Sequence, residues 1–289
     1  MSENKALDIF GIQPIANAID TAVTKSFEGI EGFLKLVCAP ALEEVGLLIK
    51  DQVRYWRLNN MINILQKAKG KMEFIDNNLQ IKAHPRVALS ILENGSLNDN
   101  PEIQELWAGL FVSSCTKDGQ DDENLIFVDL LKQLTTIEAK IINYSCKNSR
   151  KVIYNNGLLM GDDFVIELND LKNLTGITDI HRLDRELDHL RSLELIGTSM
   201  GGGGFNSDDI NLSAHIGPTA LALNLYTKTQ GYNGDPSEFW STNIISQEVY
   251  FKEREEKEKQ ENEIYRLERQ KEREDKAKKI NENSENKQA

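Results

Sequence analysis

The chain has few cysteines for its length, and none of them lies in a metal-binding or redox motif. The three cysteines among 289 residues are Cys38, Cys115 and Cys146, and no CxxC pair or Cys/His cluster accompanies them. Disulfide-stapled domains and zinc ribbons need closely spaced cysteines, so neither class fits. We expect reduced thiols of a cytosolic protein, buried as small apolar residues.

A long apolar run is also missing. The most apolar window, Phe27–Ile49, is interrupted by five charged residues, whereas a membrane-spanning helix needs about 20 mostly apolar ones. Met1–Lys5 has no basic segment followed by an apolar stretch, so no secretory signal is expected. We expect a cytoplasmic protein, and an amphipathic helix lying on the inner membrane or on a partner stays open.

The chain has no excess of positive charge, since its formal net charge is −12. The stretch after Gln247 contributes thirteen acids and twelve bases, a charge of −1, which leaves −11 for the preceding body. A phosphate backbone repels such a surface unless bases gather locally. This balance argues against a nonspecific nucleic-acid binder.

Sets of residues that carry out catalysis are absent from the pattern. The four histidines form no Ser/His/Asp or Cys/His arrangement with any specific spacing. His181, Asp184 and Asp188 share one helical face, but a closed zinc site needs further ligands, and salt bridges explain these residues more simply. We therefore predict no catalytic residue, no metal and no cofactor.

The end of the chain is unusually rich in charge of both signs. Residues 248–279 contain eleven acids and eleven bases, with many acids four positions before a base, an order that stabilises a solvated helix. A coiled coil needs apolar positions through several heptads, and here only Ile264 and Leu267 qualify, with Tyr265 beside them. We predict a solvated helical tail that serves as a spacer or a contact arm.

The body before this tail shows helical spacing first. Apolar residues recur at three- and four-residue steps from Val45 to Ala68, which predicts one long helix closed by Gly70. Further helices are expected after Pro85, after the Asn100-Pro101 cap, from Leu125 to Leu134, and after the capping box at Thr135.

The pattern changes after Arg150. A short β-rich run, two helices, a glycine-rich tip between two strands and a last helix after Pro218 resemble the layout of a winged helix. We predict a mainly α protein with a helical N-terminal domain, a winged-helix-like α+β second domain and a long charged C-terminal helix. The expected boundaries are 1–150 for the helical domain, 151–232 for the winged-helix-like domain, 233–247 for a linker and 248–289 for the tail.

One segment alternates bases with aromatics. Arg54, Tyr55, Trp56 and Arg57 would, on a basic surface, suggest stacking on single-stranded nucleic acid. On the predicted helix, however, Trp56 lies on the apolar stripe. We expect Trp56 to pack in the core, with the two arginines paired to nearby acids such as Asp51.

Two further groups of charged residues are candidates for interaction. Asp118, Asp121 and Asp122 crowd a loop around Gly119, but their spacing is not that of a calcium loop, so capping and solvation are expected. Arg182 and Arg185 lie on the second helix of the winged segment, where a DNA-reading domain places its contacts. Residues 162–197 contain nine acids and four bases, which disfavours that role.

Several stretches together carry a family resemblance. They are Gln52–Leu58, His84–Arg86, Ile91–Gly95, Leu106–Leu110, Ser113–Cys115, Asp118–Asn124, Leu130–Leu134 and Gly217–Tyr226. This set resembles the abortive infection alpha family over roughly residues 6–231. The resemblance implies a bacterial protein of phage defence, in which the infected cell stops growing or dies. It implies no catalytic residues.

These observations favour a non-enzymatic defence protein that acts through contacts with a protein partner, a second copy or a membrane surface. Its N-terminal amphipathic helices are the expected effector surface. The alternative is a DNA-binding transcriptional regulator that uses the winged-helix-like domain. An enzyme with an unrecognised site is the least favoured hypothesis.

Overall fold

The computed structural model describes residues 52–72, 81–197, 212–241 and 243–285, together with residues 30, 32, 33 and 205. This part of the chain is mainly helical, with ten helices and small sheets. The helices are α3 (Gln52–Met72), α4 (Pro85–Gly95), α5 (Pro101–Ser113), α6 (Leu125–Leu131), α7 (Thr136–Asn148), α8 (Leu168–Thr175), α9 (Ile180–Ser192), α10 (Ala220–Thr229), α11 (Pro236–Phe239) and α12 (Gln247–Glu285).

The strands are short and form three small sheets. They are β1 (Lys82–Ala83), β2 (Cys115–Thr116), β3 (Lys151–Ile153), β4 (Leu159–Gly161), β5 (Val165–Glu167), β6 (Ser213–His215) and β7 (Ile244–Ser246). β1 pairs with β2 and β5 pairs with β6, both antiparallel. β3 lies between β4, which is antiparallel to it, and β7, which is parallel.

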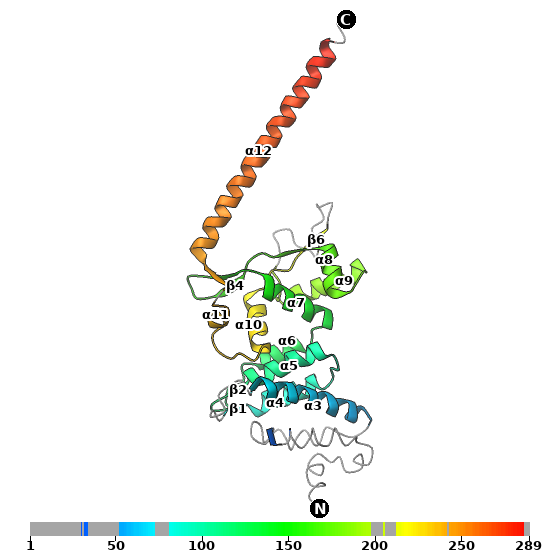
Figure 1. Ribbon diagram of the computed structural model, residues 1–289, viewed down its shortest axis with the longest axis vertical. Helices are drawn as coiled ribbons and strands as arrows, with labels where there is room; N and C mark the ends of the chain where they lie inside the picture. Colours follow the sequence, from blue (N-terminus) through cyan, green and yellow to red (C-terminus); the bar gives the residue numbers. More distant parts are fainter. Residues whose placement is uncertain are drawn as a thin grey trace, which may run out of the picture.

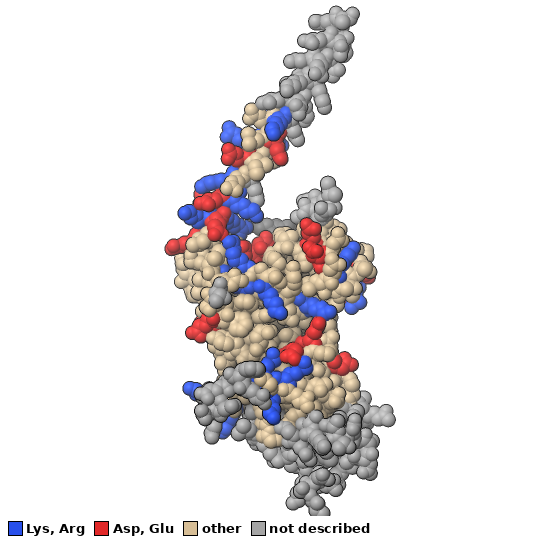
Figure 2. Space-filling view, in the orientation of Figure 1, with Lys and Arg blue, Asp and Glu red and all other residues tan. Residues whose placement is uncertain are grey.

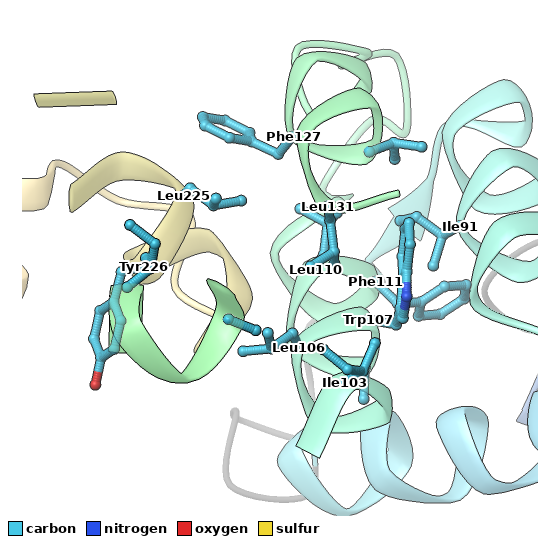
Figure 3. Close-up of a cluster of buried hydrophobic side chains, with 14 of the residues drawn as sticks. Ile91, Ile103, Leu106, Trp107, Leu110, Phe111, Phe127, Leu131, Leu225 and Tyr226 are labelled. Carbon is cyan, nitrogen blue, oxygen red and sulfur yellow. The ribbon is translucent and has the colours of Figure 1, made fainter. Parts of the chain in front are cut away.

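Helix α5 is the centre of the core. Asn100 caps it by accepting hydrogen bonds from the backbone N–H groups of Glu102 and Ile103 at 2.9 and 3.2 Å. Trp107 and Phe111 of α5 are fully buried. Figure 3 shows them on the side of α5 that faces α4, with residues of α10 on the opposite side. One continuous apolar cluster therefore joins the helices before residue 150 to those after it.

Local signals placed most of these helices correctly. The capping box predicted at Thr135 is present, because the Thr135 hydroxyl accepts from the Glu138 N–H while the Glu138 carboxylate accepts from the Thr135 N–H. Gly176 ends α8 in the left-handed conformation, at φ +73°, and Asp179 caps α9. The predicted solvated tail is confirmed as α12, whose described side chains are exposed from Phe251 onward.

Other local predictions were wrong. Gly70 does not close the first long helix, since α3 continues to Met72. Helix α4, by contrast, does end at Gly95, which is buried in its last turn, where an added Cβ would lie 2.8 Å from Ile64 Cδ1. The last helix of the body begins after Thr219, whose hydroxyl accepts from Ala222 N–H, and not at Pro218.

The wing is described only in part, because residues 198–204 and 206–211 lie outside the described residues. Residues 195–197 pair with residues 217–219: Ile196 bridges Pro218, and the N–H groups of Gly197 and Thr219 donate to the carbonyls of Gly217 and Leu195 at 2.8 and 3.1 Å. β6 pairs with β5, and Phe205 bridges Ala214 on its other side. The glycine tip itself lies outside the described residues.

Residues before α3 are described at only three positions. Ile30 is buried in the core, and the Phe33 ring lies 6.2 Å from that of Phe111. These two side chains therefore face the interior, as do Leu58, Ile62 and Leu65 of α3, whereas the other residues before Gln52, apart from Gly32, lie outside the described residues. Within the described part, no helix combines the length and apolar character that crossing a bilayer requires.

Candidate interaction site at the base of the charged helix

The charged helix α12 projects away from the body, and its base is anchored by the strand that precedes it (Figure 1). β7 pairs with β3 along Lys151, Val152 and Ile153, so the chain enters α12 directly from a sheet. The Gln247 side chain accepts a hydrogen bond from Asn155 N–H at 2.9 Å. The predicted linker, residues 233–247, thus contains α11 and β7 and packs on the body.

An aromatic side chain adds to this anchor. Tyr250 is buried, and the guanidinium of Arg254 donates to its hydroxyl at 2.9 Å. Burial, together with the nearby Asp162 carboxylate, raises the pKa of Tyr250 above its usual range. The hydroxyl therefore stays protonated at neutral pH and acts as a hydrogen-bonding group. Phe251 lies edge-on to Tyr154, with ring centroids 6.5 Å apart.

Arg150 joins the body to α12 electrostatically. Its guanidinium donates to Asp162 Oδ2 at 2.9 and 3.3 Å from Nη2 and Nε, and its Nη1 donates to Glu253 on α12. The hydrogen bond to Glu253, with a further contribution from Asp162, raises the pKa of Arg150. A two-carboxylate clamp of this kind holds the base of α12 in one orientation.

A cavity of about 600 Å³ lies at this junction. Its lining mixes both signs of charge and contains the anchor residues just described. The lining residues are Arg150, Asp162, Asp163, Val165, Tyr250, Glu253, Arg254, Lys257 and Glu258. Three cations and four carboxylates suit salt bridges with a polar surface of mixed charge, and not a ligand of a single strong charge.

A buried cation lies beneath the same junction. Lys151 is fully buried, and its ammonium donates to the carbonyls of Cys146 and Ser149 while lying 4.1 Å from the centroid of the Trp240 ring. Desolvation lowers the pKa of Lys151. This side chain therefore ties the end of α7 to α11 and to β3, which pairs with β7.

The sequence did not point to this site, although one signal was available. Val249, Tyr250 and Phe251 are apolar or aromatic residues at the start of an otherwise charged stretch. Such a group at the beginning of a solvated helix indicates where that helix rests on the body. Arg150, Asp162 and Glu253 come together only through the pairing of β3 with β4 and β7.

The bases and aromatics of α3 are arranged differently from the prediction. Trp56 is 38% exposed and is not a core residue. Arg57 donates to Ser96 Oγ at 2.9 Å and to the Glu93 carbonyl at 3.2 Å, and so pairs with the end of α4. The side chains of Arg54 and Tyr55, and the whole of Asp51, lie outside the described residues. Leu58, Ile62 and Leu65 face the core, whereas Trp56 lies on a neighbouring, more exposed face of the helix.

The acidic loop satisfies its own backbone. Asp118 accepts from the Gln120 N–H at 3.2 Å and the Thr116 hydroxyl at 3.1 Å, and the Gln120 bond in particular lowers its pKa. Asp121 accepts from the Glu123 N–H at 3.0 Å, and Asp122 lies 3.9 Å from Arg86. Both side chains are exposed, as expected for solvated residues, but neither caps a helix, because α6 begins at Leu125 with Asn124 at its cap position.

The two arginines of α9 lie on its exposed side but have different surroundings. Arg182 lies 3.5 Å from Glu186, which also accepts from the Thr135 hydroxyl at 2.6 Å. Arg185 is exposed, and the described residues supply it with no ion pair. Among the described residues, no group of three or more His, Cys, Asp and Glu side chains is arranged to hold a metal ion.

A hydrogen-bonded pair of Glu138 and His189 joins α7 to α9. Glu138 is only 1% exposed, and His189 Nδ1 lies 2.6 Å from its Oε1. Burial raises the pKa of Glu138 above 4.5, against the opposing effects of Thr135 and His189. A carboxyl group with a raised folded-state pKa contributes stability that is complete below the unfolded value and is lost as the pH rises through the folded value.

The direction of the Glu138 pKa shift predicts how stability changes with pH, and Glu105 supplies the control. We expect the stability advantage of the wild type over Glu138→Gln to shrink as the pH rises from about 4 to about 7. Glu105 is the opposite case, because Lys67 and Lys71 outweigh burial and lower its pKa, so the wild-type advantage over Glu105→Gln should grow over this interval. Urea denaturation across the pH range measures both, and equal slopes for the two variants would contradict the assignment.

The sequence also matches a known protein family. The family model described as abortive infection alpha matches residues 57–214. The chain belongs to the abortive infection alpha family. Membership implies a role in abortive infection, the phage-defence response. No curated protein and no solved structure matched the chain.

The match covers most of the body of this abortive infection alpha protein but not its end. It runs from Arg57 in α3 to Ala214 in β6, a narrower range than the resemblance over residues 6–231. The Gly217–Tyr226 stretch lies outside it, as do α10, α11 and α12. Arg150 and Asp162 of the junction are therefore inside the family region, whereas Tyr250 and Glu253 come from beyond it.

Proposed function

We propose that this abortive infection protein acts without catalysis, through contacts that α12 makes with another protein. The observation that carries the proposal is the placement of α12. Its base is fixed by β7, Tyr250 and the Arg150–Glu253 pair, while the rest of its described length is exposed. A helix that is anchored at one end and solvated along its sides is suited to reach a partner.

The electrostatics of the body support a protein partner over a membrane or a nucleic acid. The body carries −11 of the net charge of −12, and both anionic lipids and phosphate backbones repel such a surface. Lysine, arginine and acidic residues alternate along α12, as the part of it coloured in Figure 2 shows. Mixed charge of this kind fits a complementary protein surface.

The chemistry of the described cysteines and of the tyrosine at the junction supports a role without catalysis. The thiols of Cys115 and Cys146 are buried, and burial raises the pKa of Cys146 to about 12. Tyr250, the one hydroxyl side chain that lines the cavity at the junction, keeps its proton because its pKa is also raised. Neither group is set up as a nucleophile at neutral pH.

The test of this proposal is phage plating on bacteria that carry the gene. We expect protection in the wild type, seen as fewer plaques and as poor host survival at high multiplicity. Ile264→Gln with Leu267→Gln should restore phage growth at least about tenfold, because these exposed side chains, at 56% and 53%, are aliphatic residues midway along α12, away from its base. Ile126→Gln on α6, at 60% exposed, is the matched control and should leave protection unchanged.

Two outcomes would reject the proposal. Full growth of phage and host in the wild type would remove the defence role. Undiminished protection in the Ile264/Leu267 variant, with the protein present at normal levels, would remove α12 as the contact element.

A DNA-binding regulator is the second candidate, and the arrangement of β5, α8, α9 and β6 favours it. Their order and the β5–β6 pairing support a winged-helix-like unit as a proposal, and Arg185 is exposed on its second helix. Against it stand the neighbouring Asp188, which pairs with Arg191, and the acidic body. We expect the full chain to leave a fluorescent duplex unbound at about 0.15 M salt. Binding that is lost in Arg182→Glu/Arg185→Glu would establish the regulator instead.

A further inference from the structure

A short apolar group midway along α12 separates a segment of net negative charge from a segment of net positive charge. Ile264, Tyr265 and Leu267 are all more than half exposed. Residues 252–263, on the body side of them, contain six acids and four bases, a charge of −2. Residues 268–279, on the far side, contain four acids and six bases, a charge of +2. The helix is therefore acidic near the body and basic far from it, with an apolar patch at 264–267 between.

This pattern is complementary to itself when one copy is reversed. If two α12 helices cross antiparallel at the apolar patch, residues 252–263 of each face residues 268–279 of the other, so −2 meets +2 on both sides. A parallel pair would place like charge beside like charge along both parts. Ile264 of one copy would then face Leu267 of the other, which removes both from water.

We propose that α12 is a self-association element and that its partner is a second copy of this chain, bound antiparallel through a two-fold axis at residues 264–267. The contact surface is the same on both copies, as a closed dimer with two-fold symmetry requires. The two bodies, each with a charge of −11, repel each other little in this arrangement, because the reversed pairing keeps them at opposite ends of the helix pair. The helices themselves are nearly neutral and can therefore come together.

The pairing also reaches the cavity at the junction. Residue 279 of one copy would lie opposite residue 252 of the other, which directly precedes Glu253. The end of each helix then comes beside the cavity lined by Arg150, Asp162 and Glu253 of the opposite copy. The mixed charges of that lining, four carboxylates and three cations, can form salt bridges with the acids and bases of the arriving helix.

The strength of the association should depend on salt. Only a small apolar patch is buried and the remaining contacts are exposed charges, so we expect a dimer at about 50 mM salt that dissociates at about 1 M salt, where screening shortens to about 3 Å. Sedimentation velocity of the full chain measures this. A chain that stays monomeric at high protein concentration and low salt would overturn the proposal.

Charge reversal separates this pairing from general stickiness. Glu256→Lys with Glu263→Lys turns the −2 part into +2, and Lys271→Glu with Arg273→Glu turns the +2 part into −2. All four side chains are exposed. Each variant alone should have its dissociation constant raised at least about tenfold, whereas an equimolar mixture should associate as the wild type does. Association of either variant alone at wild-type strength would overturn the proposal.

Single cysteines determine the direction of the pair. In the antiparallel register, residue 260 faces residue 271, so Gln260→Cys and Lys271→Cys should form an intermolecular disulfide when mixed. Each alone should not, because identical positions would lie about 16 Å apart along the axis. A disulfide in Gln260→Cys alone, beyond the level of the wild type, would show a parallel pair and contradict the proposal.

The inference rests on α12 being a contact element, as proposed above, but its tests use purified protein and no phage. A dimer without protection would leave the self-association intact and reject the defence mechanism. Protection by a strictly monomeric protein would reject the dimer and would point to a different protein on the same helix.

Discussion

Gly109→Ala should destabilise the protein by about 3 kcal/mol or more. A Cβ at this position in α5 would lie 1.6 Å from the carbonyl oxygen of Thr229 and 2.3 Å from its carbon. Both are backbone atoms at the end of α10, so no side chain can turn aside to make room. The two helices would have to separate, which exposes the apolar residues between them.

Gly70→Ala is the control for this substitution. Gly70 lies inside α3, and an added Cβ meets nothing within 4 Å. Alanine is the better helix former there, so a gain of about 0.5–1 kcal/mol is expected. Urea denaturation of the two variants measures both effects. Equal stability of the two would show that α5 and α10 do not approach each other as described.

Lys151→Ala is the second substitution with a large expected effect, a loss of about 3 kcal/mol or more. It removes the donor that satisfies the buried carbonyls of Cys146 and Ser149, and it leaves a void under the ring of Trp240. Unsatisfied buried polar groups cost about 1–3 kcal/mol each, and the cavity adds to that.

Lys147→Ala tests whether this loss is specific to burial. Lys147 is exposed in the last turn of α7, four residues before Lys151, so its loss should change stability by no more than about 0.5 kcal/mol. Denaturation followed by tryptophan fluorescence reports on stability and, through Trp240, on the contact itself. A Lys151 variant as stable as the Lys147 variant would contradict the buried position of that ammonium.

The helices were predictable because their signals are local. Asn100, Thr135 and Asp179 each cap the helix that follows them by bonds that span two or three residues. A proline at the first helical position marks α4 and α5 in the same way. Such signals need no knowledge of the rest of the chain.

The candidate site was not predictable because it depends on pairings between distant segments. β3, β4 and β7 have three residues each, too few for a recognisable alternation, and β7 reaches β3 across about ninety residues of sequence. The prediction that Trp56 packs in the core was wrong for a related reason. The apolar spacing around Trp56 fits two neighbouring faces of the helix, and only packing against α5 selects one of them.

The two parts of the chain have different tasks in the proposed function. The body carries the family match and holds the base of α12 through Arg150. The helix carries the contact surface, with unlike charge on either side of the apolar patch at 264–267. If this division is right, protection should follow the charge pattern of α12 while the stability of the body stays unchanged.

Phage plating on cells that express the two charge-reversed variants, separately and together, tests this claim most directly. We predict that Glu256→Lys/Glu263→Lys alone and Lys271→Glu/Arg273→Glu alone each lose protection, and that the two expressed together regain it. Protection by either variant alone at the wild-type level, with both proteins folded and equally abundant, would contradict the account.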